Sequence, residues 1–417
     1  MALYLVSYLD RGNIGNAKVA GVQDDLALSD HQWQWVLYAF YIVYTCFEWS
    51  IIFWKILPAH IWCAFVCLGW SAAAMWSGAV TSYGGLVACR TLLGLFEAAF
   101  GAGAVYFLTL FYNRRELGVR LSLVLGTSPL ANTFASALAY GIMEVKNSIA
   151  PWRLLFIIDS PSTAGFLTET EKTEAVERLQ MRDRTAKSKV SGKQYFSGLA
   201  DYKSWCHATM HFCCNYSFAG LSNFLPTVVA NMGFTDQEAQ GVTAPVYLAS
   251  FLVSVGAAYT SDRVGTRGFF VAGFAAMGAV GYVLLATTYG TASRYVGVWL
   301  ASMGIFSALA LNVTWLFSNS AGDSKKGAAW AVFTTVGQLS SFISSSLYPD
   351  TEAPRYVTGS AVGCGLTGFI VIVSLSLHFK LAHENRKRDR EDGPVARNAT
   401  VDVTVDGQNM RNFRFMT

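Results

Sequence analysis

Two ionisable residues, Arg90 and Glu97, lie seven positions apart in a long apolar stretch of the sequence. Seven positions are close to two helical turns, so the two side chains would share one helix face, about 10 Å apart. A guanidinium presents a planar fork of donors that suits a carboxylate ligand. A buried carboxyl group beside it can take up and release a proton. The pair predicts a site for an anion and a proton, and a structural ion pair between helices is the alternative.

A second polar patch, Asp10 to Asn16, interrupts another apolar stretch. Asp10 and Asn13 would share a helix face, while Gly12 and Gly15 would allow close packing or local unwinding. Ionisable groups inside apolar spans are costly and mark functional sites by default. We therefore interpret Asp10 as a second protonatable carboxyl group beside a substrate-binding arginine. Hydrogen bonding between packed helices is the alternative for any single residue of the patch.

The elements that carry these residues are predicted to be membrane-spanning helices. Hydrophobic residues make up 53% of the 417 residues, charged residues 14%, and the mean hydropathy is +0.35. The apolar runs are near the roughly 20 residues that span a bilayer as a helix. Backbone groups in lipid must bond within their own segment, and these runs lack the two-residue alternation of strands. The fold class is therefore all-α, a polytopic membrane protein.

The runs divide into two sets of six, which is the plan of a secondary transporter. We expect an N-terminal bundle over 1–165, a charged linker over 166–203, a C-terminal bundle over 204–380 and a disordered tail over 381–417. The sixth span looks truncated, because the apolar run 152–158 covers only about 10 Å of a hydrocarbon core near 30 Å. The first span begins abruptly, which suggests that its start is clipped.

Basic residues predict the orientation, since Lys and Arg concentrate on the cytoplasmic side. Most of the 31 Lys and Arg residues fall on one side when both termini are cytoplasmic. We expect a multi-pass protein of the plasma membrane that is a monomer in contact with lipid. The basic run after the last span is better explained by orientation or anionic lipid than by nucleic acid.

Several segments resemble one family of transporters. They are YLDRGNIGNAKVAG from Tyr8, FYIVYTCFE ending at Glu48, and RTLLGLFEAAFGAGAVYFLTLFYNRRE from Arg90. Together they resemble the anion:cation symporter branch of the major facilitator superfamily, within it the fungal allantoate-permease group. SDRVGTR, from Ser261, is similar to the superfamily's gating loop between spans eight and nine. The likeness extends over nearly the whole chain.

The resemblance implies a two-bundle fold of nominally 12 helices and proton-coupled uptake of a small organic anion. Allantoate, nicotinate, pantothenate and related vitamins or nitrogen sources are the carboxylates that it suggests. It assigns substrate handling to Arg11 and Arg90, with Tyr8 lining the same cavity, and proton handling to Asp10 and Glu97. It assigns the gating loop to Asp262, Arg263, Gly265 and Arg267. From the residues alone we add two polar substrate contacts, Asn13 of the patch in span one and Asn312 of span ten.

Two other functions remain open. A drug:proton antiporter would be expected to carry a glycine pair after Pro129 in span five, where the sequence reads Gly126-Thr-Ser-Pro129-Leu-Ala-Asn132. A non-transporting sensor, or an inactive truncated isoform, would account for the short sixth span. The sequence shows no phosphate loop, nucleophile motif or metal-ligand cluster, so we expect no enzyme, no cofactor and no bound metal.

Overall fold

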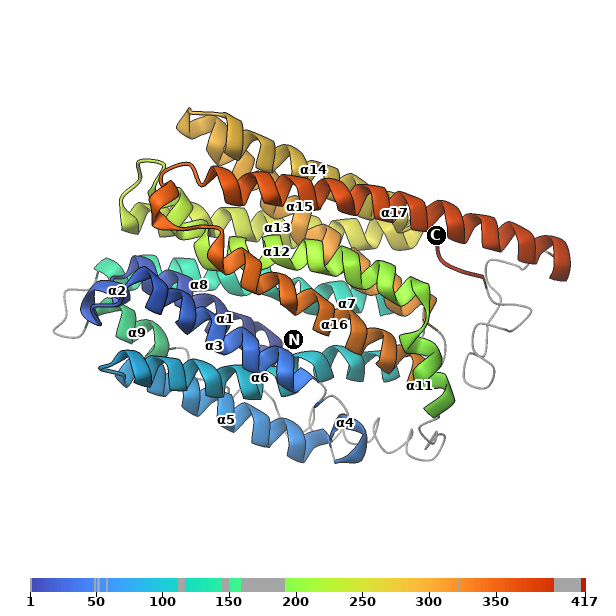
Figure 1. The fold of residues 1–417 in the computed structure, drawn as a ribbon, viewed down its shortest axis with the longest axis horizontal. Helices are drawn as coiled ribbons and strands as arrows, with labels where there is room; N and C mark the ends of the chain where they lie inside the picture. Colours follow the sequence, from blue (N-terminus) through green and yellow to red (C-terminus); the bar gives the residue numbers. More distant parts are fainter. Residues whose placement is uncertain are drawn as a thin grey trace.

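The computed structural model describes residues 2–48, 50, 53–57, 59–111, 117–144, 150–158, 192–320, 323–393 and 414–417. Within these ranges all regular structure is helical, as the sequence predicts (Figure 1). The N-terminal set of helices comprises α1 (Ala2–Val19), α2 (Val22–Asp25), α3 (Asp30–Phe47), α4 (Phe53–Ile56), α5 (Ala59–Ala79), α6 (Tyr83–Phe111), α7 (Leu117–Leu125), α8 (Thr127–Glu144) and α9 (Pro151–Ile158).

The C-terminal set is built from longer helices. It comprises α11 (Gly192–Leu199), α12 (Tyr202–Ala230), α13 (Asp236–Val264), α14 (Gly268–Thr287), α15 (Thr291–Asn319), α16 (Asp323–Ser346), a short 3-10 turn (Asp350–Glu352) and α17 (Val357–Asp392). Two helix starts are fixed by capping boxes, Ser29 with Gln32 at α3 and Thr235 with Glu238 at α13. Such reciprocal bonds satisfy backbone N–H groups that the first turn leaves free.

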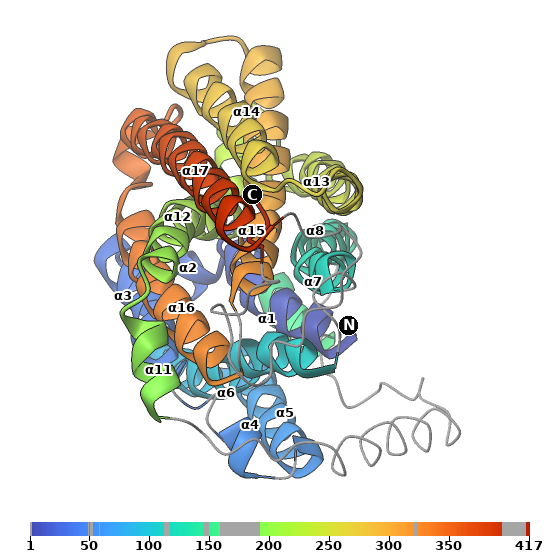
Figure 2. The same cartoon turned by 90° about the vertical axis from the view of Figure 1, so that its right-hand side faces the viewer.

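The long helices run roughly side by side, and each set packs mainly within itself (Figures 1 and 2). Helix α6 packs on α3 and α5, and α14 packs on α15 and α17. The two sets meet where α1 packs on α12, α8 on α13, α7 on α15 and α3 on α16. Helix α7 also packs on α13, and α6 on α16, so six pairs of helices from opposite halves line the interface between the sets.

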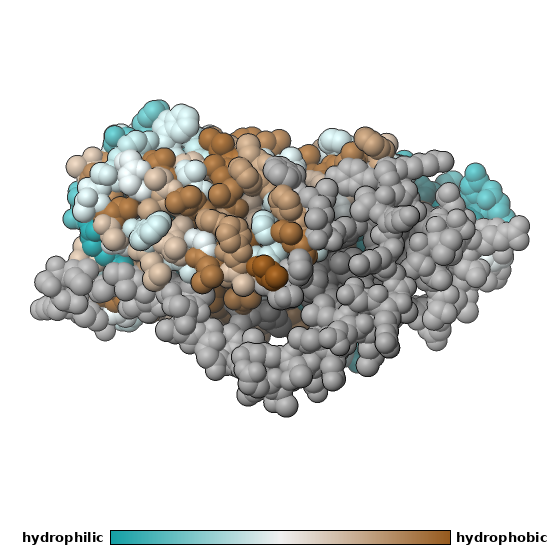
Figure 3. Space-filling model, turned by 90° about the horizontal axis from the view of Figure 1, so that it is seen from below, coloured by the Kyte–Doolittle hydropathy of each residue, from teal (hydrophilic) through white to brown (hydrophobic). Residues whose placement is uncertain are grey.

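Seven of the described helical segments are long and apolar enough to cross a membrane. These segments are Ile61–Ala79, Tyr83–Val105, Arg120–Met143, Asp236–Val264, Gly268–Thr287, Thr291–Asn319 and Val357–Glu391. Their outward faces keep large apolar side chains exposed, such as Leu68 at 73% and Ile372 at 63%. On the face in Figure 3 apolar side chains occupy the middle and hydrophilic ones gather toward the ends. This pattern is that of a surface solvated by lipid rather than water.

The structure corrects one expectation about the chain ends. The tail that we predicted to be disordered from 381 is helical as far as Asp392, and Arg414–Thr417 pack against the helices. Phe415 is buried, and Met416 exchanges hydrogen bonds with Asn319. The prediction of disorder was based on the charged composition of the tail as a whole. It gave no weight to Phe415 and Met416, the apolar pair near its end. Residues 394–413 lie outside the described part.

The short sixth span is present as α9, an eight-residue helix that begins at Pro151. Trp152 and Arg153 connect its start to Asp25 of α2, with Trp152 Nε1 and Arg153 Nη2 donating to Asp25 Oδ2 at 3.0 and 3.3 Å. Residues 159–191, which hold the end of this span and most of the linker, lie outside the described residues.

Candidate functional site

A small cavity of about 50 Å³ lies between the two sets of helices. Helices α1, α3, α12 and α16, none of them among the seven most apolar segments, supply most of its wall. Their polar residues thus face inward rather than toward lipid. The lining residues are Tyr4, Tyr8, Arg11, Tyr44, Glu48, Gly101, Leu125, His211, Asn215, Phe218, Leu309, Val313, Trp330, Phe333, Thr334 and Gln338.

An ion pair between α1 and α6 forms one wall of this cavity. Arg11 Nε donates to Glu97 Oε2 at 3.1 Å, and Ser7 Oγ donates to Glu97 Oε1 at 2.9 Å. Glu97 is fully buried, whereas 11% of the Arg11 side chain is exposed. Both carboxylate oxygens of Glu97 are thus engaged, which holds it in place. Arg11 is the member of the pair that reaches the cavity.

Aromatic rings surround the Arg11 guanidinium. Its central carbon lies 4.5 Å from the ring centre of Tyr44, 5.2 Å from Phe40 and 5.4 Å from Tyr8. Contacts of this kind stabilise a cation by about 0.5–2 kcal/mol each, depending on how dry the site is. They hold a positive charge at the cavity wall without neutralising it, so it can still attract an anion.

Small residues on α6 bring this aromatic face close. A Cβ added at Gly94 would stand 2.6 Å from the carbonyl oxygen of Phe40, and one at Gly101 would stand 2.6 Å from Tyr44 Oη. Either contact is closer than side chains tolerate, so α3 approaches α6 only because these positions are glycine.

Arg90 lies deeper than the sequence suggested. It is 2% exposed, does not line the cavity, and its guanidinium carbon lies 4.8 Å from the ring centre of Phe40. Its Nε and Nη1 atoms have no hydrogen-bond partner among the described residues. Asp10, Arg11, Tyr41 and Glu97 lie within electrostatic range of it. Glu97 thus forms its ion pair with Arg11 of α1, although the helical spacing placed Arg90 on the same face of α6.

Two further predicted substrate contacts lie away from the cavity lining. Asn13 donates to the backbone oxygen of Leu155 at 3.5 Å, joining α1 to α9. Asn312 donates to the backbone oxygen of His207 at 3.1 Å, and its own carbonyl oxygen lies 2.7 Å from His207 Nδ1. That arrangement places the His207 proton on Nδ1 and fastens α15 to α12. Asp10 is buried at 1% exposure and also lies outside the lining.

The structure adds cavity residues to which sequence reasoning gave no role or only a minor one. Glu48 enters the sequence analysis only as the end of the FYIVYTCFE segment, and His211, Asn215 and Gln338 are not among the residues assigned a role there. His211 stacks on Phe333 with ring centres 4.0 Å apart. Asn215 Nδ2 donates to Ser341 Oγ at 2.9 Å. Their convergence depends on packing between α3, α12 and α16, which no spacing within one helix reveals.

The predicted gating loop joins α13 to α14. Gly265 ends α13 in the left-handed region, with φ of 78°, which favours glycine. Asp262 and Arg267 form an ion pair, and 1% of the Arg267 side chain is exposed. Arg267 Nε also donates to Met416 Sδ at 2.8 Å, and its backbone N–H donates to the Thr417 oxygen at 2.5 Å. The guanidinium carbon of Arg263 lies 4.6 Å from the ring centre of Tyr259.

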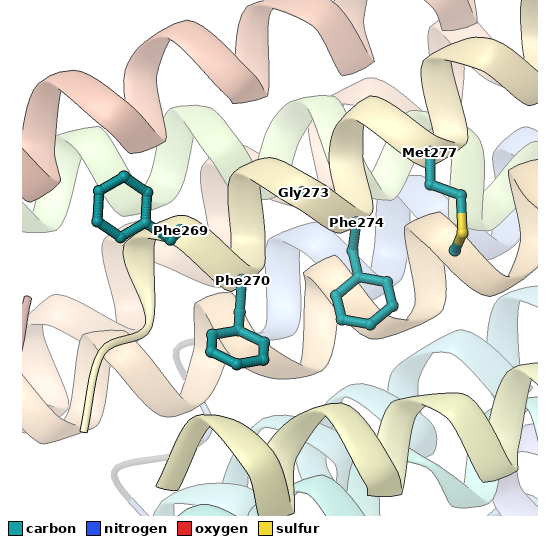
Figure 4. A pocket seen from close by; sticks show the side chains of 5 residues that line it. All are labelled: Phe269, Phe270, Gly273, Phe274 and Met277. Carbon is teal, nitrogen blue, oxygen red and sulfur yellow. The ribbon is translucent and has the colours of Figure 1, made fainter. Parts of the chain in front are cut away.

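A larger hollow on α14 lacks the chemistry of a polar site. It is lined by Phe269, Phe270, Gly273, Phe274 and Met277, all from one apolar helix, and it opens outward (Figure 4). We assign this surface to lipid, because a bilayer solvates apolar side chains that have no polar group beside them.

Apolar spans around a charged cavity between two helix sets define a membrane transport protein. The family model of the Major Facilitator Superfamily matches residues 1–345. The chain therefore belongs to this superfamily and is a transporter rather than an enzyme.

Relatives and solved structures agree with this assignment. An uncharacterized transporter of Schizosaccharomyces pombe is 30% identical over 93% of this chain and 82% of its own length. The high-affinity nicotinic acid transporter of Saccharomyces cerevisiae is 27% identical over 93% of this chain and 76% of its own. A bacterial homolog of the human lysosomal transporter Spinster, solved inward-facing and unoccupied, has a TM-score of 0.64. It is 12% identical, with 93% of this chain and 96% of that one covered. That likeness concerns the fold alone.

Proposed function

We propose that this transporter takes up a small organic anion of the carboxylate class together with protons, and that nicotinate is the first substrate to test. The observation that carries the proposal is the buried Arg11–Glu97 pair at the wall of the central cavity. A guanidinium ringed by aromatic side chains suits a flat, charged ligand such as an aromatic carboxylate. The similarity to a nicotinic acid transporter supports the same class of substrate.

In this proposal Arg11 and Tyr8 contact the substrate, and Arg90 adds positive charge from behind Phe40. Glu97 and Asp10 take up protons from outside and release them inside. Asn13 and Asn312 would act by holding α1 on α9 and α15 on α12. The loop residues Asp262, Arg263, Gly265 and Arg267 would act as the gate.

The cavity fits this scheme as one state of a cycle. Its volume of about 50 Å³ suits a few water molecules rather than an organic anion, so the two sets must move apart to admit substrate. We place this motion between bundles 1–165 and 204–380, joined by the linker 166–203. Both termini would lie in the cytoplasm of a monomer in the plasma membrane.

The test uses the full chain in proteoliposomes and labelled nicotinate. We expect uptake to be stronger when the outside is acidic, and Glu97→Gln to abolish that dependence while retaining nicotinate exchange across the membrane. Asp236→Asn, which changes an exposed carboxyl group at the start of α13, is the matched control. The proposal would be wrong if Glu97→Gln left pH-driven uptake intact. Export of a drug in exchange for entering protons would instead favour the antiporter.

A further inference from the structure

Glu48 is a buried carboxyl group at the boundary between the two helix sets. It ends α3, is 3% exposed and lines the central cavity. Across the cavity it faces Thr334, Thr335 and Gln338 of α16, a helix of the opposite set. Nothing in the mechanism proposed above uses it.

The surroundings of Glu48 offer little positive charge. Among the cavity-lining residues, the ionisable groups are Arg11, Tyr4 and Tyr8 from α1, Tyr44 from α3, and His211 from α12. Arg11 is the cation within electrostatic range of Glu48, but its Nε already donates to Glu97. A carboxylate at Glu48 would therefore compete with Glu97 for a single guanidinium. Burying a second negative charge there is unfavourable, because each ion loses its hydration.

The hydroxyl group of Thr334 also favours a protonated, neutral Glu48. Its Oγ1 donates to the backbone oxygens of Trp330 and Ala331 at 3.0 and 3.3 Å. Because a hydroxyl carries one hydrogen, Thr334 gives up these backbone bonds if it donates to Glu48, and while it keeps them it faces Glu48 as an acceptor. An acceptor facing a carboxylate oxygen would repel it, whereas a carboxylic acid could donate to it. Neither Oε atom of Glu48 accepts a hydrogen bond from the described residues.

We propose that Glu48 holds a proton while α3 and α16 are packed together, and that it is a further proton-carrying carboxyl group, in addition to Glu97 and Asp10. The inference rests on the proposed function for its role in transport, but not for its protonation. When water enters the cavity, the O–H bond of Glu48 breaks, the electron pair stays on the carboxylate and the proton leaves with water. The new carboxylate then competes with substrate for Arg11. A proton on Glu48 thus keeps Arg11 available to the anion, which couples proton binding to anion binding.

The direct test is infrared difference spectroscopy of the purified full chain without substrate, on stepping from acidic to alkaline pH. We expect the carbonyl stretch of a protonated carboxylic acid to disappear as pH rises. The band that belongs to Glu48 should be missing from the difference spectrum of Glu48→Gln, retained in Glu97→Gln, and retained at a shifted frequency in Glu48→Asp. A pH difference spectrum of Glu48→Gln identical to that of the unmodified chain would overturn the proposal. Should Glu48→Gln fail to fold, the shift in Glu48→Asp decides the question.

Nicotinate binding supplies a second measurement. If one proton binds with each anion, the affinity of the unmodified chain falls about tenfold per pH unit once Glu48 loses its proton. In Glu48→Gln, which mimics the protonated acid, the affinity should stay high over the same range. Affinity that falls equally in both proteins would contradict the coupling. If the unmodified chain binds no nicotinate at any pH, the substrate proposal fails while the infrared result still decides whether Glu48 carries a proton.

Discussion

Arg11 does two things at once in this structure, since it binds Glu97 and faces the cavity. A lysine at this position would keep the charge but could not donate in two directions from one plane. We expect Arg11→Lys to lose one hydrogen bond to a charged group, about 1.5–3 kcal/mol, or roughly 10- to 150-fold in apparent nicotinate affinity. The loss should appear in KM measured by uptake.

Arg153→Lys is the matched control for that change. Arg153 pairs with Asp25 of α2, away from the cavity, so its replacement should leave the KM for nicotinate within about twofold, as expected of a partly exposed pair. Equal effects of the two substitutions would show that Arg11 acts through folding rather than through the substrate.

The sequence identified Arg11 and Glu97 as charged residues of the site but not as partners. Periodicity compares positions on one helix, so it related Glu97 to Arg90, which shares α6 with it. The actual partner is 86 residues away on α1. The surroundings of Glu48 are likewise beyond the reach of helical periodicity, because the residues that face it lie on α16, in the other half of the chain. Spacing thus found the ionisable residues, and only tertiary packing could pair them.

Among the elements, α12 and α16 are fastened by a buried charge cluster outside the apolar spans. Asp201, the N-cap residue of α12, receives Lys325 of α16 at 2.7 Å and Lys203 at 3.2 Å. Burial alone would raise the pKa of Asp201, but the hydrogen bond from Lys325 and the charge of Lys203 outweigh it and lower the pKa. The ionised form of Asp201 is therefore the form that the fold stabilises.

The sign of the pH effect follows from that lowered pKa. The ionised Asp201 contributes fully to the free energy of unfolding above the pKa of an aspartate in the unfolded chain, near 3.9. This contribution is lost as the pH falls through the lower pKa of Asp201 in the folded chain. We expect Asp201→Asn to reduce stability by about 1–3 kcal/mol at neutral pH and to be harmless in strong acid. Thermal unfolding in detergent at several pH values measures the loss of stability at neutral pH and its absence in strong acid. Glu391→Gln, which removes an exposed pair with Lys387, should cost at most about 0.5 kcal/mol. A pH-independent effect of Asp201→Asn would contradict the assignment.

Helix boundaries were predicted more closely than helix partners. The apolar run 205–228 indicates a helix, and the observed α12 extends to Tyr202–Ala230 because Asp201 caps its polar first turn. The apolar run 117–143 indicates one helix, whereas α7 and α8 are separated at Gly126. The order at Phe415 and Met416 escaped prediction altogether, because its stability comes from Trp315, Asn319 and Asn385 on distant helices.

For the whole molecule, the proposed cycle predicts that α1 separates from α12, and Gly15 marks how closely the two helices now approach. A Cβ added at Gly15 would lie 2.5 Å from the backbone oxygen of Asn223. A backbone atom cannot rotate away as a side chain can, so Gly15→Leu must push the two halves apart. Asn223 itself bonds to Tyr41 Oη at 2.9 Å, and Asn132 bonds to Ser222 at 3.3 Å, so three inter-half contacts would loosen together.

We expect Gly15→Leu to destabilise this packed arrangement by about 1–3 kcal/mol, which is a 5- to 150-fold shift between conformations. Nicotinate uptake should fall by a similar factor although the chain still folds. Hydrogen–deuterium exchange should rise in α12 around Asn223 and stay unchanged in α14. Gly273→Leu is the matched control, because a Cβ at Gly273 meets no atom within 4 Å. If both leucine variants transport normally, the α1–α12 contact does not open during the cycle, and the motion must take place at other helix pairs between the two sets.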